Sequence, residues 1–143
     1  MATYREWQRA IVERLQALLG SGRVFEESVP EVAHLPMNDL GMVEPYAVLW
    51  FGQRVQGGPG FNSMCGTLGS AHRALFYVGI GAPTGEVAND VAAFVTDSLR
   101  GFRPVGQGEL IEDFSPTIRE PLDMSGVNPR IHVRIAYSGI IDV

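Results

Sequence analysis

The sequence predicts an α+β fold, in which a mixed, mostly antiparallel sheet has two helices packed against it. Two segments carry apolar residues at helical spacing, and several shorter runs are continuously apolar or alternate as strands do. The length of 143 residues matches one domain that can bury a core without disulfide bonds. We therefore expect residues 1–143 to form a single domain.

The first helix is expected over residues 3–19. Thr3 and Glu6 have capping-box spacing, in which each side chain satisfies a backbone donor of the first turn. Glycines at positions 20 and 22 should end the helix. Its apolar stripe is predicted to face the sheet and consists of Trp7, Ile11, Leu15 and Leu18.

The first half of the chain should then supply two strands. A short strand is expected at residues 24–27. Residues 29–45 contain three prolines and show no clear period, so we expect a wandering loop. Residues 46–51 follow as a continuous apolar run, which suits a strand that is covered on both faces.

The second half should complete the sheet with a strand at residues 73–80, another at residues 109–118 and a closing strand at residues 130–138. Pro116 interrupts the second of these, which indicates a strand end, an edge or a bulge. The closing strand alternates most clearly, because four apolar residues point one way and the polar residues point the other. The polar side, which we expect to be solvated, consists of Arg130, His132 and Arg134.

The second helix is expected over residues 85–100, with Thr84 as its N-cap and Gly101 just past its end. Its predicted apolar face consists of Val87, Val91, Phe94, Val95 and Leu99. Together the periodicities predict a core that includes Trp7, Ile11, Leu15, Val91, Phe94, Val133 and Ile135.

A long glycine-rich loop is expected at residues 52–71, which hold six glycines and one proline. A loop of this length inside a domain is usually functional or disordered. Phe61, Met64 and Leu68 are apolar side chains with no local core to join, so they are the candidate residues of an assembly interface. We predict that this loop is mobile in an isolated subunit and becomes ordered on assembly.

Charge and composition exclude several function classes. The net charge is −5 and no basic cluster is present, so tight binding to duplex DNA is not expected. The first residues lack the apolar core of a signal peptide, and no apolar run approaches the roughly 18 residues of a membrane span. The single cysteine, Cys65, fits a reducing compartment. We therefore expect a protein of the cytoplasm, or of a particle assembled there, with no membrane partner.

The residues that could carry chemistry form no catalytic, cofactor-binding or metal-binding motif. Cys65 lies near His72 in sequence, but the glycine-rich loop around it does not fix the geometry that a nucleophile requires. His34, His72 and His132 belong to three different elements and lack the short spacing of a metal site. We therefore predict that the chain is not an enzyme and holds no cofactor.

The order of these segments resembles that of a known protein family. The helix ends in LLGSGRVFEESVPE, and a strand begins after a proline in PYAVLWFG. A later strand feeds the second helix in HRALFYVGIGAPTGEVANDVAAFVTDSLRGFRP, and the chain closes in NPRIHVRIAYSGIIDV. Over nearly the whole chain this layout resembles the tail terminator family of long-tailed bacteriophages.

The resemblance implies a structural virion protein that forms a ring, commonly of six subunits, at the head-proximal end of the tail. Such a ring stops polymerisation of the tail tube and offers a surface to the head–neck connector. Its partners would be further copies of itself, the tail tube protein and the connector protein, while DNA passes through the lumen without tight binding. Assembly would take place in the host cytoplasm.

Two alternatives remain open at this level. Another head–tail connector or tail-completion subunit would share much of this layout. A small soluble enzyme or ligand-binding domain, with site residues scattered along the sequence, would instead show a concave pocket with convergent polar groups.

Overall fold

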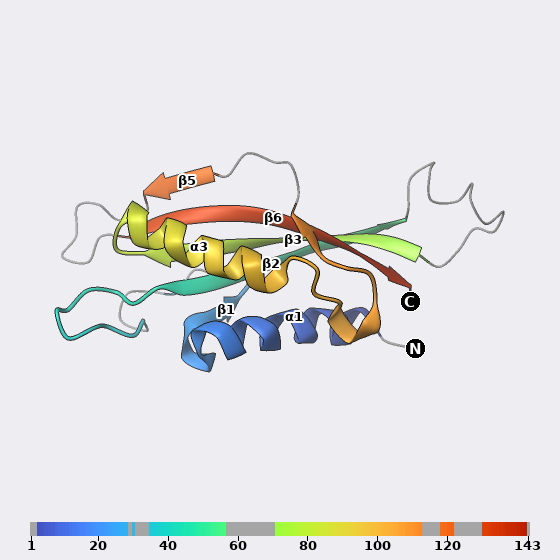
Figure 1. Ribbon diagram of the computed structural model, residues 1–143, viewed down its shortest axis with the longest axis horizontal. Helices are drawn as coiled ribbons and strands as arrows, with labels where there is room; N and C mark the ends of the chain where they lie inside the picture. The colour runs from blue at the N-terminus through green and yellow to red at the C-terminus, as the bar shows by residue number, and fades with distance from the viewer. Residues whose placement is uncertain are drawn as a thin grey trace.

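The computed structural model describes residues 3–28, 30, 35–56, 71–112, 118–121 and 130–142. Its fold is α+β, as predicted, with two helices against a mixed sheet (Figure 1). The strands are β1 (Val24–Glu26), β2 (Tyr46–Gln56), β3 (Ala71–Ala82), β4 (Ile111–Glu112), β5 (Ile118–Pro121) and β6 (Ile131–Asp142). The helices are α1 (Tyr4–Leu19) and α3 (Gly85–Leu99), with short 3₁₀ turns η1 (Ser21–Arg23) and η3 (Pro104–Gly106).

The sheet has the strand order β1-β2-β3-β6-β4, and β5 pairs with the same edge of β6 as β4 does. Only β1 and β2 run parallel; every other pair among the described strands is antiparallel. The predicted strand at residues 109–118 is therefore two short strands separated by residues 113–117, which lie outside the described residues. The prediction of a mixed, mostly antiparallel sheet is confirmed.

Helix α1 begins at the predicted capping box. The Thr3 backbone nitrogen donates to Glu6 Oε2 at 2.6 Å, and the Glu6 backbone nitrogen donates to Thr3 Oγ1 at 3.2 Å. The hydrogen bonds with Thr3 lower the pKa of the Glu6 carboxyl below its usual value. Two donors of the first turn are thus satisfied at the point where the sheet-facing stripe of the helix begins.

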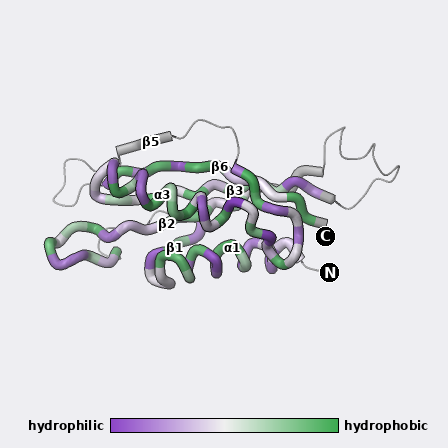
Figure 2. The backbone as a smooth tube through the Cα atoms, viewed as in Figure 1, coloured by the Kyte–Doolittle hydropathy of each residue, from purple (hydrophilic) through white to green (hydrophobic). Residues whose placement is uncertain are grey.

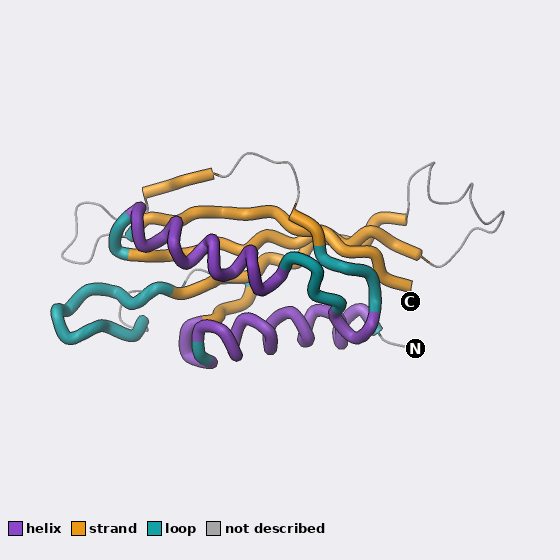
Figure 3. Tube along the Cα trace, viewed as in Figure 1, coloured by secondary structure: helices purple, strands orange, loops and turns teal. Residues whose placement is uncertain are grey.

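Both helices lie on one face of the sheet, which we call the front face (Figures 1 and 3). Trp7 is fully buried there, with its ring edge-on to Phe76 at 5.8 Å between centroids. Phe76 in turn stacks on Tyr137 of β6 at 5.4 Å. The Tyr137 hydroxyl lies 2.8 Å from Thr96 Oγ1 of α3, and burial raises its pKa to about 12. One chain of contacts therefore joins α1, the middle of the sheet and α3.

The predicted face of α3 is wrong by part of a turn. Phe94 is 65% exposed and Val91 is half-buried, so neither is a fully buried core residue. Val95 and Leu99 are buried as predicted, and Ala88 and Ala92, which the prediction did not include, complete the buried face. Small alanines let the helix backbone approach the sheet, and this turns the larger Phe94 outward. The other five predicted core residues are buried.

The opposite face of the sheet, the back face, carries a smaller second core. Leu35, Val43, Tyr46 and Val48 are buried together, with Phe25 and Trp50 packed against them. The front and back cores together cover β2 on both sides, as its continuous apolar run predicted. Figure 2 shows that hydrophobic residues likewise dominate much of β6.

The boundaries of the predicted glycine-rich loop also need correction. Gly52 is still in β2, which continues to Gln56 across an irregularity in register between Phe51 and Arg54, and β3 begins at Ala71. The span between the two strands is therefore shorter than the predicted residues 52–71. The rest of the predicted loop, residues 57–70, lies outside the described residues. Its mobility in an isolated subunit and its ordering on assembly therefore stay predictions.

We predict that truncating two large residues of α3 lowers the stability of the fold by very different amounts. Leu99→Ala should lower the free energy of unfolding by about 2–5 kcal/mol, because Leu99 is fully buried in the front core. Phe94→Ala should lower it by less than about 1 kcal/mol, because the ring is largely solvated. Urea unfolding, repeated at several protein concentrations, measures both; equal losses would place Phe94 in the core after all.

Candidate functional site

The predicted interface residues Phe61, Met64 and Leu68 lie outside the described residues, as does Cys65. Among the described residues, large apolar or aromatic side chains are exposed at several places, which include three surfaces. One is on the helices, one is at the tip of the loop before β2, and one is on the back face of the sheet.

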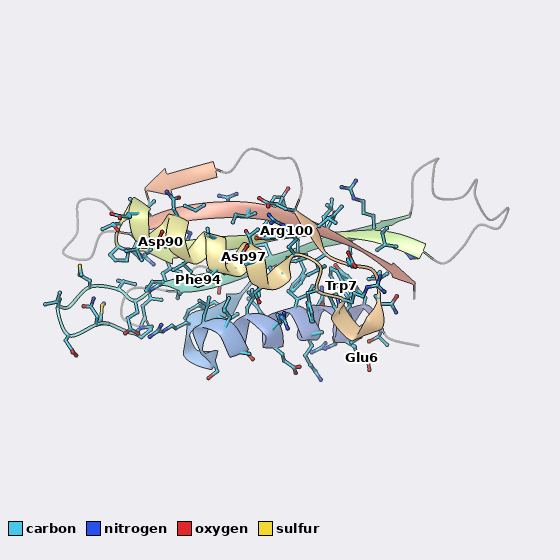
Figure 4. All side chains as sticks on the ribbon, viewed as in Figure 1. Glu6, Trp7, Asp90, Phe94, Asp97 and Arg100 are labelled. Carbon is cyan, nitrogen blue, oxygen red and sulfur yellow. The ribbon has the colours of Figure 1, made fainter. Side chains whose placement is uncertain are left out.

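The surface on the helices, the helix patch, consists of Leu18, Val91 and Phe94 with Asp90 and Asp97 beside them. Leu18, Leu19, Val91 and Phe94 line a shallow hollow of about 240 Å³ between α1 and α3. Asp90 and Asp97 stand one turn before and one turn after Phe94 on α3 (Figure 4), and both are exposed. The patch is therefore a shallow apolar hollow with carboxylates beside it.

The second surface, the loop tip, consists of Met37, Leu40 and Met42. Leu40 is 82% exposed, and the two methionines are about 40% exposed. Asn38 fixes the turn, because its Oδ1 accepts from the backbone nitrogens of Leu40 and Met42, both at 2.9 Å. A backbone bridge between Met37 and Val43 closes the loop. The exposed Leu40 is therefore held on an ordered turn.

The third surface lies over two glycines of β3. In the register of the sheet, Gly81 lies opposite Tyr46, and Gly79 lies between Val48 and Arg134. A Cβ on Gly81 would stand 2.2 Å from Tyr46 Cζ, and one on Gly79 would stand 2.7 Å from Trp50 Cζ3. The two aromatic rings of β2 therefore lie across β3 at positions where only glycine leaves room.

Tyr46 crosses Gly81 to reach a buried polar cluster. Its hydroxyl lies 2.5 Å from His132 Nε2, and Arg130 Nη1 donates to it at 3.1 Å. Arg130 also donates to the Pro30 carbonyl at 2.9 Å. Burial raises the pKa of Tyr46, against the opposing effect of the Arg130 charge.

The polar side of β6 is thus not the solvated face that its alternation predicted. His132 is only 6% exposed, and Arg130 is half-buried. The reason is that a tyrosine two strands away reaches over glycine and covers this end of the back face. Because Tyr46 and His132 are both buried, their contact holds β2 to β6 and is not open to a substrate.

Further along the same face, Trp50, Tyr77 and Arg134 form the sheet patch. They line a shallow hollow of about 310 Å³. Arg134 Cζ lies 5.8 Å from the centre of the Trp50 ring, within the range of a cation–π contact, and Tyr77 is 45% exposed. The patch offers flat aromatic surface beside a guanidinium.

The described residues offer few groups for metal binding or catalysis. They contain no group of three or more His, Cys, Asp or Glu side chains placed to hold a metal ion. A hollow of about 610 Å³ near the start of α1 is lined by residues that include Arg5, Arg9, Glu26 and Glu27. Glu27 Oε1 there accepts from the Phe51 backbone nitrogen, which gives it a structural role. None of the described helices is both long and apolar enough to span a membrane.

Solved structures share this fold. Twenty-six of their chains match. One of them aligns over 97% of this chain and 96% of its own length, with a TM-score of 0.50 and 13% identity. At that identity the likeness shows the fold alone. No family model matches the chain, and no curated protein matches it in sequence.

Sequence reasoning missed the back-face residues, although one signal for them is present. Gly79 and Gly81 interrupt the strand FYVGIGA, and glycine inside a strand often marks the close approach of another group. Tyr46 and Trp50 in PYAVLWFG are four residues apart, so a strand places both on one face, as it does Gly79 and Gly81. Their pairing with the glycines depends on the strand register, which the sequence does not show.

We predict that Gly81→Ala lowers the free energy of unfolding by about 1–3 kcal/mol, because the added methyl group displaces Tyr46. Gly22→Ala is the matched control, since a Cβ at Gly22 meets nothing within 4 Å and should change stability by less than about 1 kcal/mol. Thermal unfolding of the two variants compares them. Equal stability would mean that Tyr46 does not lie over β3.

Proposed function

We infer that this chain is a structural subunit of the tail-terminator type, which assembles into a ring, commonly of six copies, on the end of a bacteriophage tail tube. In this proposal the ring stops tube growth and joins the tail to the head–neck connector. DNA passes through its lumen without tight binding, in keeping with a net charge of −5 per subunit.

The observation that carries the proposal is the exposure of large apolar side chains on separate, well-built surfaces. Phe94 is 65% exposed on a helix and Leu40 is 82% exposed on a hydrogen-bonded turn. Large side chains are costly to leave in water, and clusters of them typically mark contacts with other proteins. Several such surfaces suit a subunit that contacts its own copies and also a second protein.

The order of the elements gives further support. The family resemblance rests on an order of helix, strand, strand, helix and closing strand, and these elements occur in that order. The enzyme alternative has less support, because Tyr46 and His132, whose polar side-chain atoms are in contact, are both buried. A connector or tail-completion subunit differs from a terminator in its partner, so the experiment must include the tube protein.

We predict that the purified chain forms a ring, either alone or when mixed with tail tube protein. Light scattering should then give a mass several times the 15.6 kDa of one chain. Antibody labelling of phage tails should place the protein at the head-proximal end. A monomer under both conditions, or label only at the distal tip or inside the capsid, contradicts the proposal.

We also predict that the loop tip serves a contact outside the ring. Leu40→Asp should leave the fold intact, because the side chain is 82% exposed, but should reduce attachment to tube or connector at least about tenfold. Asp39→Ser on the same turn is the matched control. Pull-down with each partner protein measures the effect, and unchanged capture by both would assign the loop tip no role in joining.

A further inference from the structure

We propose that the edge of β2 beyond Leu49, beside the first turns of α1, is a groove that binds an extended segment of a second protein by strand addition. The bound segment would pair with the backbone of β2 and carry carboxylate side chains toward Arg5 and Arg9. Such a groove goes beyond the proposed function, because it forms within one subunit and needs no ring.

Strand β1 covers only a short part of β2. Its three residues pair in parallel with Ala47, Val48 and Leu49. Strand β2 itself continues to Gln56, and among the described strands only β3 pairs with it beyond Leu49. The side of residues 50–56 that faces away from β3 is therefore an edge of the sheet as far as the described chain extends.

Glu27 ends β1 in an unusual way. Its φ of 63° lies in the left-handed region, which turns the chain out of the strand. Its backbone nitrogen still donates to the Leu49 carbonyl at 2.8 Å. In a continuing parallel ladder the Glu27 carbonyl would next accept from the Phe51 nitrogen. The Glu27 side chain accepts that hydrogen bond instead, through Oε1 at 3.2 Å, so a carboxylate stands where a strand would offer a carbonyl.

The hollow of about 610 Å³ lies at this point of the edge. Its walls are the first turns of α1 on one side and Glu26 and Glu27 on the other, and Phe51 of β2 also lines it. Helix α1 packs against both β1 and β2 (Figure 1). The space is therefore where β1 would continue if Glu27 did not turn the chain away, and it suits a segment in the extended conformation.

The charges around the hollow indicate the kind of segment that fits. Arg5 and Arg9 stand one turn apart on the α1 side, and both are exposed. Glu6, which lies between them in sequence, is held in the capping box. Carboxylates on the α1 side of a bound segment would meet the two guanidinium groups, which favours association and orients the segment. Glu26 and Glu27 disfavour acidic residues at the β1 end.

Two other roles compete for this edge. A capped edge protects a sheet against unwanted pairing, and a pair of arginines in a hollow also suits a free anion such as phosphate. The left-handed φ of Glu27 favours strand addition, because backbone strain of this kind tends to persist at binding sites. Both competing roles are separated from strand addition by the test.

The test uses the full chain and three synthetic heptapeptides that carry a fluorescent label. The first alternates valine and glutamate, the second has lysine in place of glutamate, and the third is the first peptide with methylated backbone nitrogens. Fluorescence anisotropy should show that the glutamate peptide binds at least about tenfold more tightly than either control, because lysine meets arginine and N-methylation removes the donors for main-chain pairing. Amide hydrogen exchange, followed by NMR, should slow at Phe51 when the glutamate peptide is bound.

Matched variants separate the Glu27 cap from general charge effects. Glu27→Gly should raise the affinity for the glutamate peptide at least about threefold, because the Phe51 nitrogen loses its side-chain acceptor and glycine adopts a positive φ without strain. Glu27→Gln removes the charge but keeps an oxygen acceptor, so its effect should be smaller. Arg9→Gln should lower the affinity at least about threefold, whereas Ala17→Glu makes the same change in net charge at the other end of α1 and should leave it unchanged. Circular dichroism checks that each variant is folded.

Each alternative role has its own outcome. If the glutamate peptide does not bind, or if exchange at Phe51 is unchanged by it, the edge is only shielded and the proposal is overturned. If the N-methylated peptide binds equally well and inorganic phosphate displaces both, the hollow is an anion site. If Glu27→Gly raises the mass measured by light scattering and no peptide binds, the edge takes a second copy instead. None of these outcomes bears on the ring, which the measurement with tube protein tests separately.

Discussion

The antiparallel pairing of β3 with β6 is the constraint on which the other features depend. It runs without a break from Ala71 opposite Asp142 to Ala82 opposite Ile131. Because side chains alternate along a strand, this single register places Phe76 and Tyr137 under the helices and sets Gly81 beside His132 on the back. A slip of one residue would exchange the two sets and lose the front core and the back cluster together.

Sequence patterns predicted the elements well because each pattern is local. The capping box, the helical stripe of α1 and the apolar run of β2 all need only neighbouring residues, and all three are present, except that Leu18 at the end of the predicted stripe is exposed. The face of α3 was predicted only in part, because two stripes lie side by side on it and the prediction combined residues of both. One consists of Val87, Val91 and Phe94, and the other of Ala88, Ala92, Val95 and Leu99. Close packing on the sheet selects the second stripe, in which two of the four residues are alanine.

The back face could not be predicted because its contacts join strands that are distant in sequence. Tyr46 and His132 are 86 residues apart and meet only through the register of β2 with β3 and of β3 with β6. Alternation correctly placed His132 on the side of β6 away from the helices. It did not show that a tyrosine crosses a glycine to cover that side, so a buried histidine looked like a solvated one.

The same two glycines that admit the aromatic rings also make the two sides of the subunit unlike each other. With larger residues at positions 79 and 81, Tyr46 and Trp50 could not lie across β3, and neither the buried cluster nor the aromatic hollow would form. The front is covered by the protein's own helices, and the outer side of α3 is acidic and carries Phe94. The back is left with rings and a guanidinium. Thr96 and the buried face of α3 likewise fix that helix to β6, so the interior packing determines which side chains each side of the subunit presents to solvent.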